Sequence, residues 1–163
     1  MIIAQSFAKV MGLYGERTGA LHVVCGNKQT AAKVLSQLKI IIRVNYSSPP
    51  AHGARIASLI LNDVSLRQQW LNELVNVTNR ITKMRTLLRS TLERIGAKGT
   101  WEHVTKQIGM FSFTGLSLKQ SEAMVKEHEI YMTKNGRISV AGLTSSNVEY
   151  VAKCMKDVLD KYP

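Results

Sequence analysis

The most informative stretch of the chain lies near its start, at residues 6–17, and reads SFAKVMGLYGER. Lys9 stands there among small and apolar residues that can desolvate it, and a neutral amine can form a Schiff base with an aldehyde. Ser6 and Arg17 flank the lysine with a hydroxyl and a guanidinium, which are donors that phosphate recognition favours. By spacing alone, a surface lysine in a glycine-punctuated loop is the more common explanation of Lys9. The stretch therefore indicates either a cofactor lysine or an ordinary loop.

The hydrophobic pattern on either side of this stretch predicts an α/β protein. The apolar start of the chain is typical of the end of a strand whose preceding residues are not in the sequence. The expected strands cover residues 21–25, 110–113, 130–132 and 138–140, the first of them buried. The expected helices cover residues 30–42, 53–61, 65–96, 117–127 and 146–161.

Three of the expected helices begin with the pattern of a capping box, a Ser followed three residues later by Gln or Glu. The pairs are Ser65 with Gln68, Ser117 with Gln120, and Ser146 with Glu149. The helix over residues 65–96 also carries one long apolar stripe, which predicts a core-facing side. The prolines at positions 49 and 50 end the helix before them, because proline lacks an amide donor.

Composition sets limits on the kind of protein. The 163 residues are enough for a real core, and Cys25 and Cys154 lack the spacing of a disulfide framework or a zinc site, so no metal is expected. The net charge of +11 raises the possibility of a nucleic-acid or membrane-surface binder. Its 22 Lys and Arg are dispersed, however, and no apolar run is long enough for a membrane span, so that class is the least favoured.

Further blocks of sequence follow in a fixed order, at residues 38–43 (LKIIIR), 46–50 (YSSPP), 53–56 (GARI), 107–116 (QIGMFSFTGL) and 130–142 (IYMTKNGRISVAG). Together with residues 6–17 they closely resemble aspartate aminotransferases, which are fold type I enzymes dependent on pyridoxal 5'-phosphate. The resemblance implies the C-terminal part of that fold. Residues 1–50 would end the large cofactor-binding domain, residues 51–99 would form the helical connection, and residues 100–163 would form the small α/β domain. The strand over residues 21–25 would then lack the rest of its sheet and expose edges and apolar surface.

The resemblance also assigns roles around the cofactor. Lys9 is similar to the lysine that binds pyridoxal phosphate covalently and moves the proton between the substrate α-carbon and the cofactor. Ser6 and Arg17 resemble the residues that bind the cofactor phosphate. Ser47 matches a residue that reaches the cofactor phosphate of the neighbouring subunit. Without the resemblance, Ser47 would be interpreted as an ordinary turn residue.

Three more positions are implied to bind substrate. Arg137 is similar to the arginine that holds the substrate α-carboxylate, for which a bidentate guanidinium is suited. Arg43 corresponds to the arginine that binds the distal carboxylate across a dimer interface, and Phe111 to a pocket residue. Taken singly, Arg137 could be a strand-turn arginine and Arg43 a cation favoured at a helix C-terminus.

The sequence departs from the family pattern at three positions, because Val10, Val44 and Ser48 stand where the family usually has Asn, Pro and Asn. The resemblance begins only at the cofactor lysine. The family's carboxylate for the ring nitrogen and its other ring contacts lie before that point, so we expect this chain to be a fragment that is inactive or feeble.

The expected function is amino transfer between L-aspartate and 2-oxoglutarate, giving oxaloacetate and L-glutamate. Expected partners are aspartate, glutamate and 2-oxo acids, with a homodimer as the full-length form and no nucleic acid. Residues 131–134 and 145–148 look closest to the mitochondrial type, which predicts the mitochondrial matrix, with the cytoplasm as the alternative. The competing hypothesis is a non-catalytic, truncated remnant of the aminotransferase fold.

Overall fold

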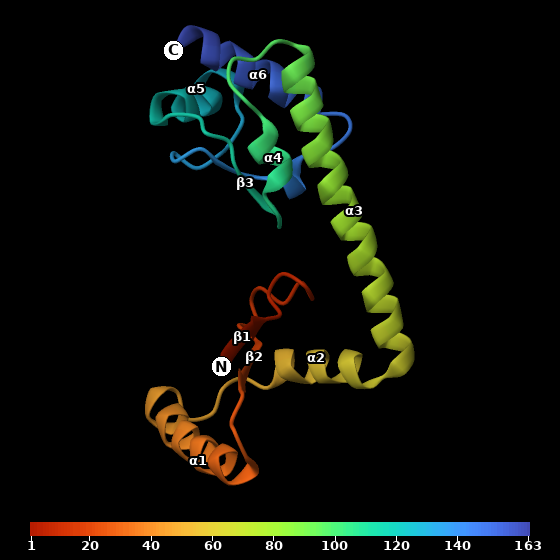
Figure 1. Cartoon of the computed structure of the whole chain (residues 1–163), viewed down its shortest axis with the longest axis vertical. Coiled ribbons are helices and arrows are strands. Elements are labelled where there is room, and N and C mark those ends of the chain that lie inside the picture. The colour runs from red at the N-terminus through yellow and green to blue at the C-terminus, as the bar shows by residue number, and fades with distance from the viewer. The chain divides into compact units, whose positions relative to one another are not determined.

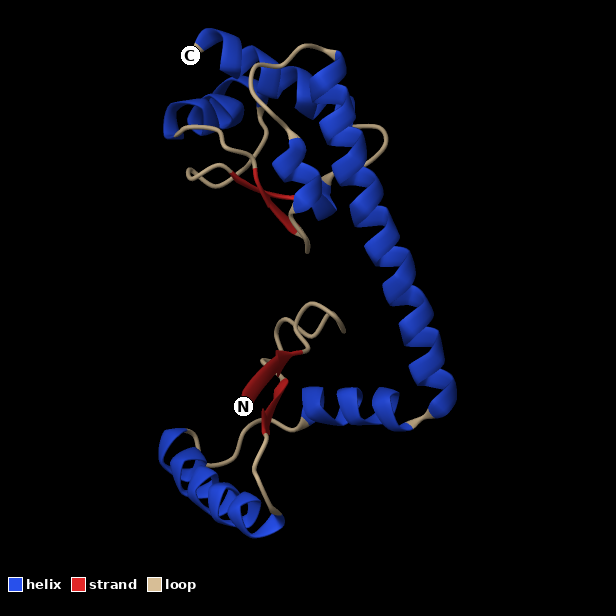
Figure 2. Ribbon diagram, viewed as in Figure 1, coloured by secondary structure: helices blue, strands red, loops and turns tan.

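A computed structural model describes all residues from Met1 to Pro163. The chain divides into two compact units, Met1–Leu74 and Val75–Pro163, and Figures 1 and 2 show the helices and strands that make up each. The first unit contains β1 (Ile2–Ser6), β2 (Gly19–Val23), α1 (Lys28–Asn45), α2 (His52–Asn62) and the start of α3 (Val64–Arg94). The second contains the rest of α3, α4 (Glu102–Lys106), β3 (Phe111–Phe113), α5 (Leu118–His128), β4 (Arg137–Ser139), a 3₁₀ turn (Val140–Gly142) and α6 (Val148–Lys161).

In the first unit, β1 and β2 form a two-stranded antiparallel ladder that runs from the pair Ile2 and Val23 to the pair Ser6 and Gly19. The strand expected over residues 21–25 therefore exists, two residues earlier. Its β-branched pattern is typical of a buried strand, but in this chain Leu21 is 55% exposed, which agrees with the expectation for a strand that lacks the rest of its sheet. The structure places no second layer over this ladder, so most of its side chains remain open to water.

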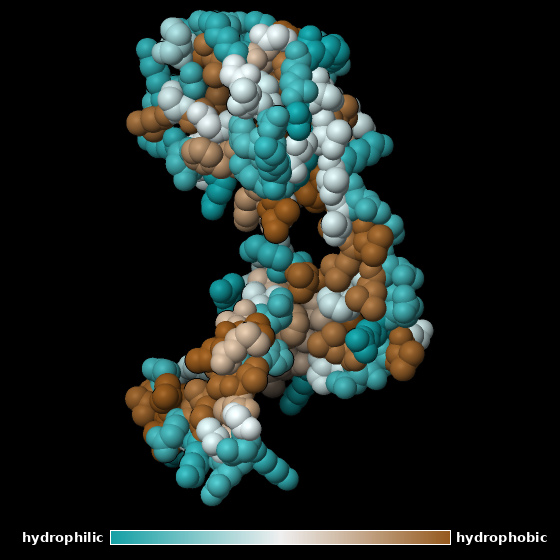
Figure 3. Space-filling view, viewed as in Figure 1, coloured by the Kyte–Doolittle hydropathy of each residue, from teal (hydrophilic) through white to brown (hydrophobic).

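The helices of the first unit lie where the periodicity predicted them. The Asn27 side chain accepts a hydrogen bond from the Thr30 amide at 2.8 Å and so caps the start of α1. No residue of α1 is buried, although it contains a run of isoleucines. Figure 3 shows apolar side chains at the surface of this part of the molecule. Ile40, Ile41 and Val44 of α1 are among the exposed apolar residues.

The long helix α3 was expected to begin with a capping box at Ser65, and this was wrong. It is Asp63 whose carboxylate accepts a hydrogen bond from the Leu66 amide, at 2.8 Å, because the helix starts one residue earlier than expected. Its apolar stripe is buried only in the second half. Leu88 and Leu92 are fully buried, whereas Leu71 is 39% exposed.

The second unit contains a continuous apolar core in which the C-terminal half of α3 packs with α5, α6 and the segments between them. Its buried members are Met84, Leu88, Leu92, Ala97, Trp101, Val104, Leu116, Ala123, Met124, Val140, Leu143, Val148, Val151, Ala152, Cys154, Met155 and Val158. β3 pairs antiparallel with β4, with Phe111 opposite Ser139 and Phe113 opposite Arg137. The second unit thus has the core that a stable domain requires.

Three local expectations in the second unit have different outcomes. The capping box at Ser117 and Gln120 is confirmed, with both reciprocal hydrogen bonds present. The one at Ser146 was wrong, because the Ser146 hydroxyl lies 2.9 Å from that of Thr144, and α6 begins after Asn147 without a side-chain cap. The strand expected over residues 130–132 was also wrong, since this segment is irregular and Ile130 and Met132 instead pack against the core.

The short helix α4 was not predicted. None of the helices combines the length and apolarity required to cross a bilayer.

Candidate functional site

The loop between β1 and β2 carries Lys9, and its shape is set by backbone hydrogen bonds. The Phe7 amide donates to the Thr18 carbonyl at 3.0 Å and closes the base of the loop. The Met11 amide donates to the Phe7 carbonyl at 3.2 Å and makes the tight turn that presents Lys9. The Lys9 side chain is exposed, and its Nζ lies 4.4 Å from the centre of the Tyr14 ring, a cation–π contact.

Ser6 and Arg17, the two residues expected to bind a phosphate, line the same pocket. Both line a shallow pocket of about 360 Å³ with residues of β1 and β2. The Ser6 hydroxyl accepts a hydrogen bond from the Ala8 amide at 3.2 Å, which leaves its own O–H to donate to a ligand. Arg17 donates one hydrogen bond, to the Tyr14 carbonyl at 3.2 Å, and four of its five donors remain for other partners. Lys9 is not among the residues that line this pocket.

The backbone of Arg17 is left-handed, with φ of +52°, a conformation that is costly for a non-glycine residue. The surrounding packing maintains it. A Cβ at Gly53 of α2 would lie 2.3 Å from the Thr18 hydroxyl and 2.6 Å from Glu16 Cβ, so only glycine allows α2 to approach the segment that carries Arg17. Sequence analysis missed this role, since a glycine at the start of a helix gives no sign of what it packs against.

Trp70 is a second supporting residue that sequence analysis missed. Its indole N–H donates to the carbonyl of Val10 at 2.9 Å and ties the residue after Lys9 to α3. Sixty positions separate Trp70 from Val10, and Trp70 stood in a helical pattern that predicted only a core residue. No signal in the sequence could have paired them.

Arg43 and Ser47 lie at the end of α1, away from the residues that line the Ser6 and Arg17 pocket. Arg43 is exposed in the last turn of the helix, where a cation is favoured by the helix dipole. Ser47 is also exposed and has a φ of +56°, and its amide donates to the Ile42 carbonyl at 3.1 Å. The side chains of both residues are thus accessible to a ligand.

In the second unit, Arg137 and Phe111 lie side by side. The guanidinium carbon of Arg137 lies 4.7 Å from the centre of the Phe111 ring. Both side chains are exposed, so the charged end of Arg137 is accessible to an anion. The preceding residue, Gly136, has φ of +82°, and a Cβ there would lie 2.8 Å from the Leu116 carbonyl oxygen, so glycine is needed to start β4 in this position.

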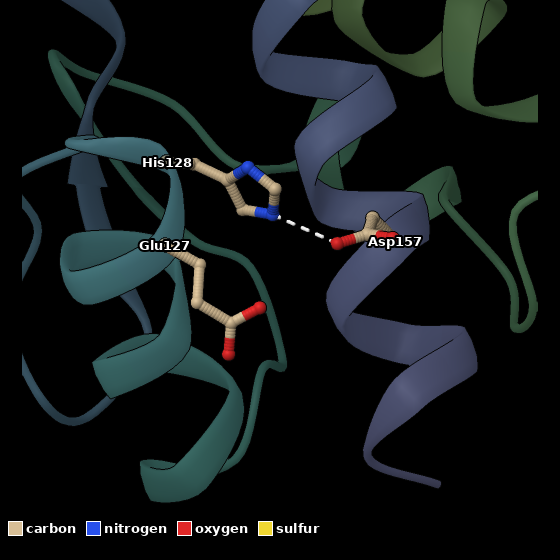
Figure 4. Close-up of side chains that lie close together, drawn as sticks. All are labelled: Glu127, His128 and Asp157. Carbon is tan, nitrogen blue, oxygen red and sulfur yellow. Dashed lines mark hydrogen bonds and ion pairs between the residues drawn. The ribbon is translucent and has the colours of Figure 1, made fainter.

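A cluster of possible metal ligands, Glu127, His128 and Asp157, joins α5 to α6 (Figure 4). His128 Nε2 lies 2.9 Å from an Asp157 carboxylate oxygen. Lys161 Nζ already bridges both carboxylates, at 2.8 Å from Asp157 and 3.1 Å from Glu127. The hydrogen bond from Lys161, followed by that from His128, holds the pKa of Asp157 below its ordinary value. These ion pairs link two helices, and a lysine occupies the position that a cation would take.

Comparisons with known proteins give one consistent result. Residues 1–154 match the family model described as aminotransferase class I and II. The chain is 55% identical over 158 residues to mitochondrial aspartate aminotransferase of Gallus gallus, which covers 97% of this chain and 37% of the relative. The chain thus spans little more than a third of the length of that relative.

Two solved structures share the arrangement. A mitochondrial aspartate aminotransferase from Trypanosoma brucei matches with a TM-score of 0.91 and 44% identity, covering 96% of this chain and 41% of that one. An aromatic-amino-acid aminotransferase from Burkholderia pseudomallei, covalently bound to pyridoxal phosphate, matches with a TM-score of 0.92 and 41% identity, covering 97% and 40%. The expected α/β fold class is therefore confirmed.

Proposed function

The chain belongs to the class I and II aminotransferases, and from this premise we propose that it carries part of the site of a pyridoxal-phosphate-dependent aspartate aminotransferase. The proposed reaction transfers an amino group between L-aspartate and 2-oxoglutarate. The observation that carries the proposal is the pairing of Ser6 with Arg17 in one pocket beside the loop of Lys9. The pocket volume lies in the range of small-ligand sites.

The residues present fit the phosphate of this cofactor. A hydroxyl with a free hydrogen and a guanidinium with several unused donors are the groups that bind a phosphate by charge-assisted hydrogen bonds. Pyridoxal phosphate, when bound, supplies an electron sink for the electrons left on the substrate α-carbon. Lys9 would attach the cofactor covalently and would then hold and return the proton of that carbon.

Substrate binding is proposed for the arginines. Arg137, stacked on Phe111, would hold the α-carboxylate with both ends of its guanidinium. Arg43 would bind the distal carboxylate, and Ser47 the cofactor phosphate, in the neighbouring subunit of a homodimer. Their exposure at the end of α1, outside the Ser6 and Arg17 pocket, supports a role in another copy's site.

We also propose the corresponding division of the chain. Residues 1–50 would belong to the large cofactor-binding domain, residues 51–99 to the helical connection, and residues 100–163 to the small α/β domain. We also propose the mitochondrial matrix as the location, which the name of the Gallus gallus relative supports, with the cytoplasm as the alternative.

We propose that turnover by these 163 residues is feeble. Lys9 is exposed, and only Ala8, Gly53 and Ala57 are buried in the first unit. Electrostatic stabilisation of developing charge is strongest in a site that excludes water, and this unit does not provide one around Lys9. The alternative, a chain without catalysis, is favoured by the same exposure.

The test is labelling with pyridoxal phosphate, followed by borohydride reduction and peptide mass spectrometry. The proposal expects saturable labelling of Lys9, suppressed by inorganic phosphate and reduced in Arg17→Ala. Lys33→Ala, which removes an exposed lysine on α1, is the matched control and should change nothing at Lys9. Labelling spread evenly over exposed lysines would contradict the cofactor site. A spectral change on adding aspartate, lost in Lys9→Ala, would show that the half-reaction survives and that the chain is more than a remnant.

A further inference from the structure

Arg85, in the second half of α3, is a buried cation that the proposed reaction does not use. It is 4% exposed. Its Nη1 donates to the Val104 carbonyl at 2.7 Å and to the Ser112 hydroxyl at 3.2 Å. Its Nη2 donates to the carbonyls of Gly109 at 2.9 Å and Phe111 at 2.5 Å. Four hydrogen bonds from one side chain therefore converge on residues 104–112.

The partners of Arg85 are all neutral. Its hydrogen bonds go to three carbonyls and a hydroxyl, and its Nε is buried without a partner. A buried charge is costly when no carboxylate compensates it, so this arrangement is poor as a means of stabilising the fold. What the guanidinium does provide is a rigid planar fork, which fixes several acceptors at once. Such geometry suits positioning better than stability.

The segment that Arg85 holds ends at the proposed substrate arginine. Phe111 gives its carbonyl to Arg85 and its ring to the guanidinium of Arg137. A hydrogen bond also ties this segment to the end of β4, because the amide of Val140, the residue after that strand, donates to the Met110 carbonyl at 2.8 Å. A shift of residues 109–111 would therefore move the ring on which Arg137 rests.

We propose that Arg85 is a positioning residue, which fastens residues 104–112 to α3 and thereby sets the Phe111 ring and the direction of the Arg137 guanidinium. The consequence for a substrate carboxylate rests on the function proposed above. The positioning itself does not, because it concerns only contacts within the second unit.

The experiment follows Arg137 by NMR in the full chain. Its side-chain protons should be shifted upfield by the Phe111 ring, and Arg137→Lys and Phe111→Leu identify the signals and the source of the shift. Arg85→Gln removes the fork, and Arg85→Lys keeps the charge but not the planar donors, so the second variant serves if the first does not fold. Arg89→Gln is the matched control, because Arg89 donates to Thr105 Oγ1 at 2.9 Å in the same segment but not to residues 109–112.

The expected result is loss of the ring-induced shift in both Arg85 variants and its retention in Arg89→Gln, with the amide spectrum of the core unchanged. An Arg85 variant that is folded and keeps the shift would overturn the proposal. Succinate, titrated into each protein and read from the same Arg137 signals, should bind about tenfold more weakly to Arg85→Lys than to the wild type, since small misplacements of binding groups are costly. If the shift is lost but the wild type binds no succinate, positioning is supported and the carboxylate role proposed for Arg137 fails.

Discussion

Leu88→Ala should strongly destabilise the second unit, which carries Arg137 and Phe111. Leu88 is 0% exposed and belongs to the core of that unit. The substitution deletes three carbon groups, worth about 2.4 kcal/mol of transfer free energy at about 0.8 kcal/mol each. The cavity left behind adds about 1 kcal/mol, for a total of about 3 to 4 kcal/mol, which lies within the range of such substitutions.

Leu118→Ala is the matched control, because Leu118 belongs to the same unit but is 57% exposed in the first turn of α5. Most of its side chain already contacts water, and its removal leaves no enclosed cavity. We therefore expect a loss below about 1 kcal/mol. Since both changes replace leucine by alanine in a helix, the small difference in helix propensity cancels between them.

The assay is urea unfolding followed by the fluorescence of Trp101, which is 5% exposed and belongs to the same core. A Trp70→Phe background removes the other tryptophan. With a slope of about 1 to 1.5 kcal/mol per M, Leu88→Ala should lower the midpoint by about 2 to 4 M and Leu118→Ala by less than about 1 M. Equal shifts for the two variants would refute the assignment of the core to the packing around α3.

Three further results are expected. Trp70→Phe loses the hydrogen bond to the Val10 carbonyl, which is worth about 1 kcal/mol. Amide hydrogen exchange should therefore accelerate in residues 8–17 and not in the second unit, and unchanged exchange would contradict the anchoring role. Burial raises the pKa of the Cys154 thiol. Iodoacetamide should therefore modify half-buried Cys25 first and reach Cys154 only when the second unit unfolds. Early modification of Cys154 would contradict its place in the core. The pKa of Asp157 is depressed in the folded chain, chiefly by its hydrogen bond from Lys161. The stabilisation that this provides is present above the ordinary pKa of about 3.9 and is lost as the pH falls below it. Acid unfolding should therefore be less steep in Asp157→Asn, and an identical acid transition would exclude the contribution.

The sequence predicted the helices well, because long apolar periodicities leave little choice of structure. Their beginnings were harder to predict, as Ser117 and Ser65 illustrate. Both start the same Ser-x-x-Gln pattern, yet only Ser117 caps a helix, since Asp63 caps α3 through the Leu66 amide and Ser65 therefore lies inside the first turn. A local pattern thus predicts a cap only where the helix starts at that residue.

Burial was the feature that the sequence predicted least well. The β-branched run around β2 is typical of a buried strand, but burial requires a second layer, and no property of the run itself provides one. The same limit applies to the site. Lys9, Ser6 and Arg17 could be found from a local stretch, and the structure brings Ser6 and Arg17 to one pocket. Trp70 contacts a residue far away in the sequence, and only the folded structure shows that contact. Arg85 acts mainly through hydrogen bonds to backbone carbonyls, which every residue type has, so the sequence does not identify its partners.

The two groups of proposed site residues rest on unequal supports, and this difference bears on what the chain can do. Phe111 and Arg137 lie on the paired strands β3 and β4, which a buried core and the four hydrogen bonds of Arg85 hold in place. Lys9 lies on a loop held by Trp70 and by the close approach of Gly53, in a unit with almost no buried residues. Local opening costs least where few apolar contacts must be broken, so the Lys9 loop should open far more often than the β3–β4 strand pair. Carboxylate binding at Arg137 should therefore be more robust than cofactor attachment at Lys9, and any loss of activity should begin at the lysine.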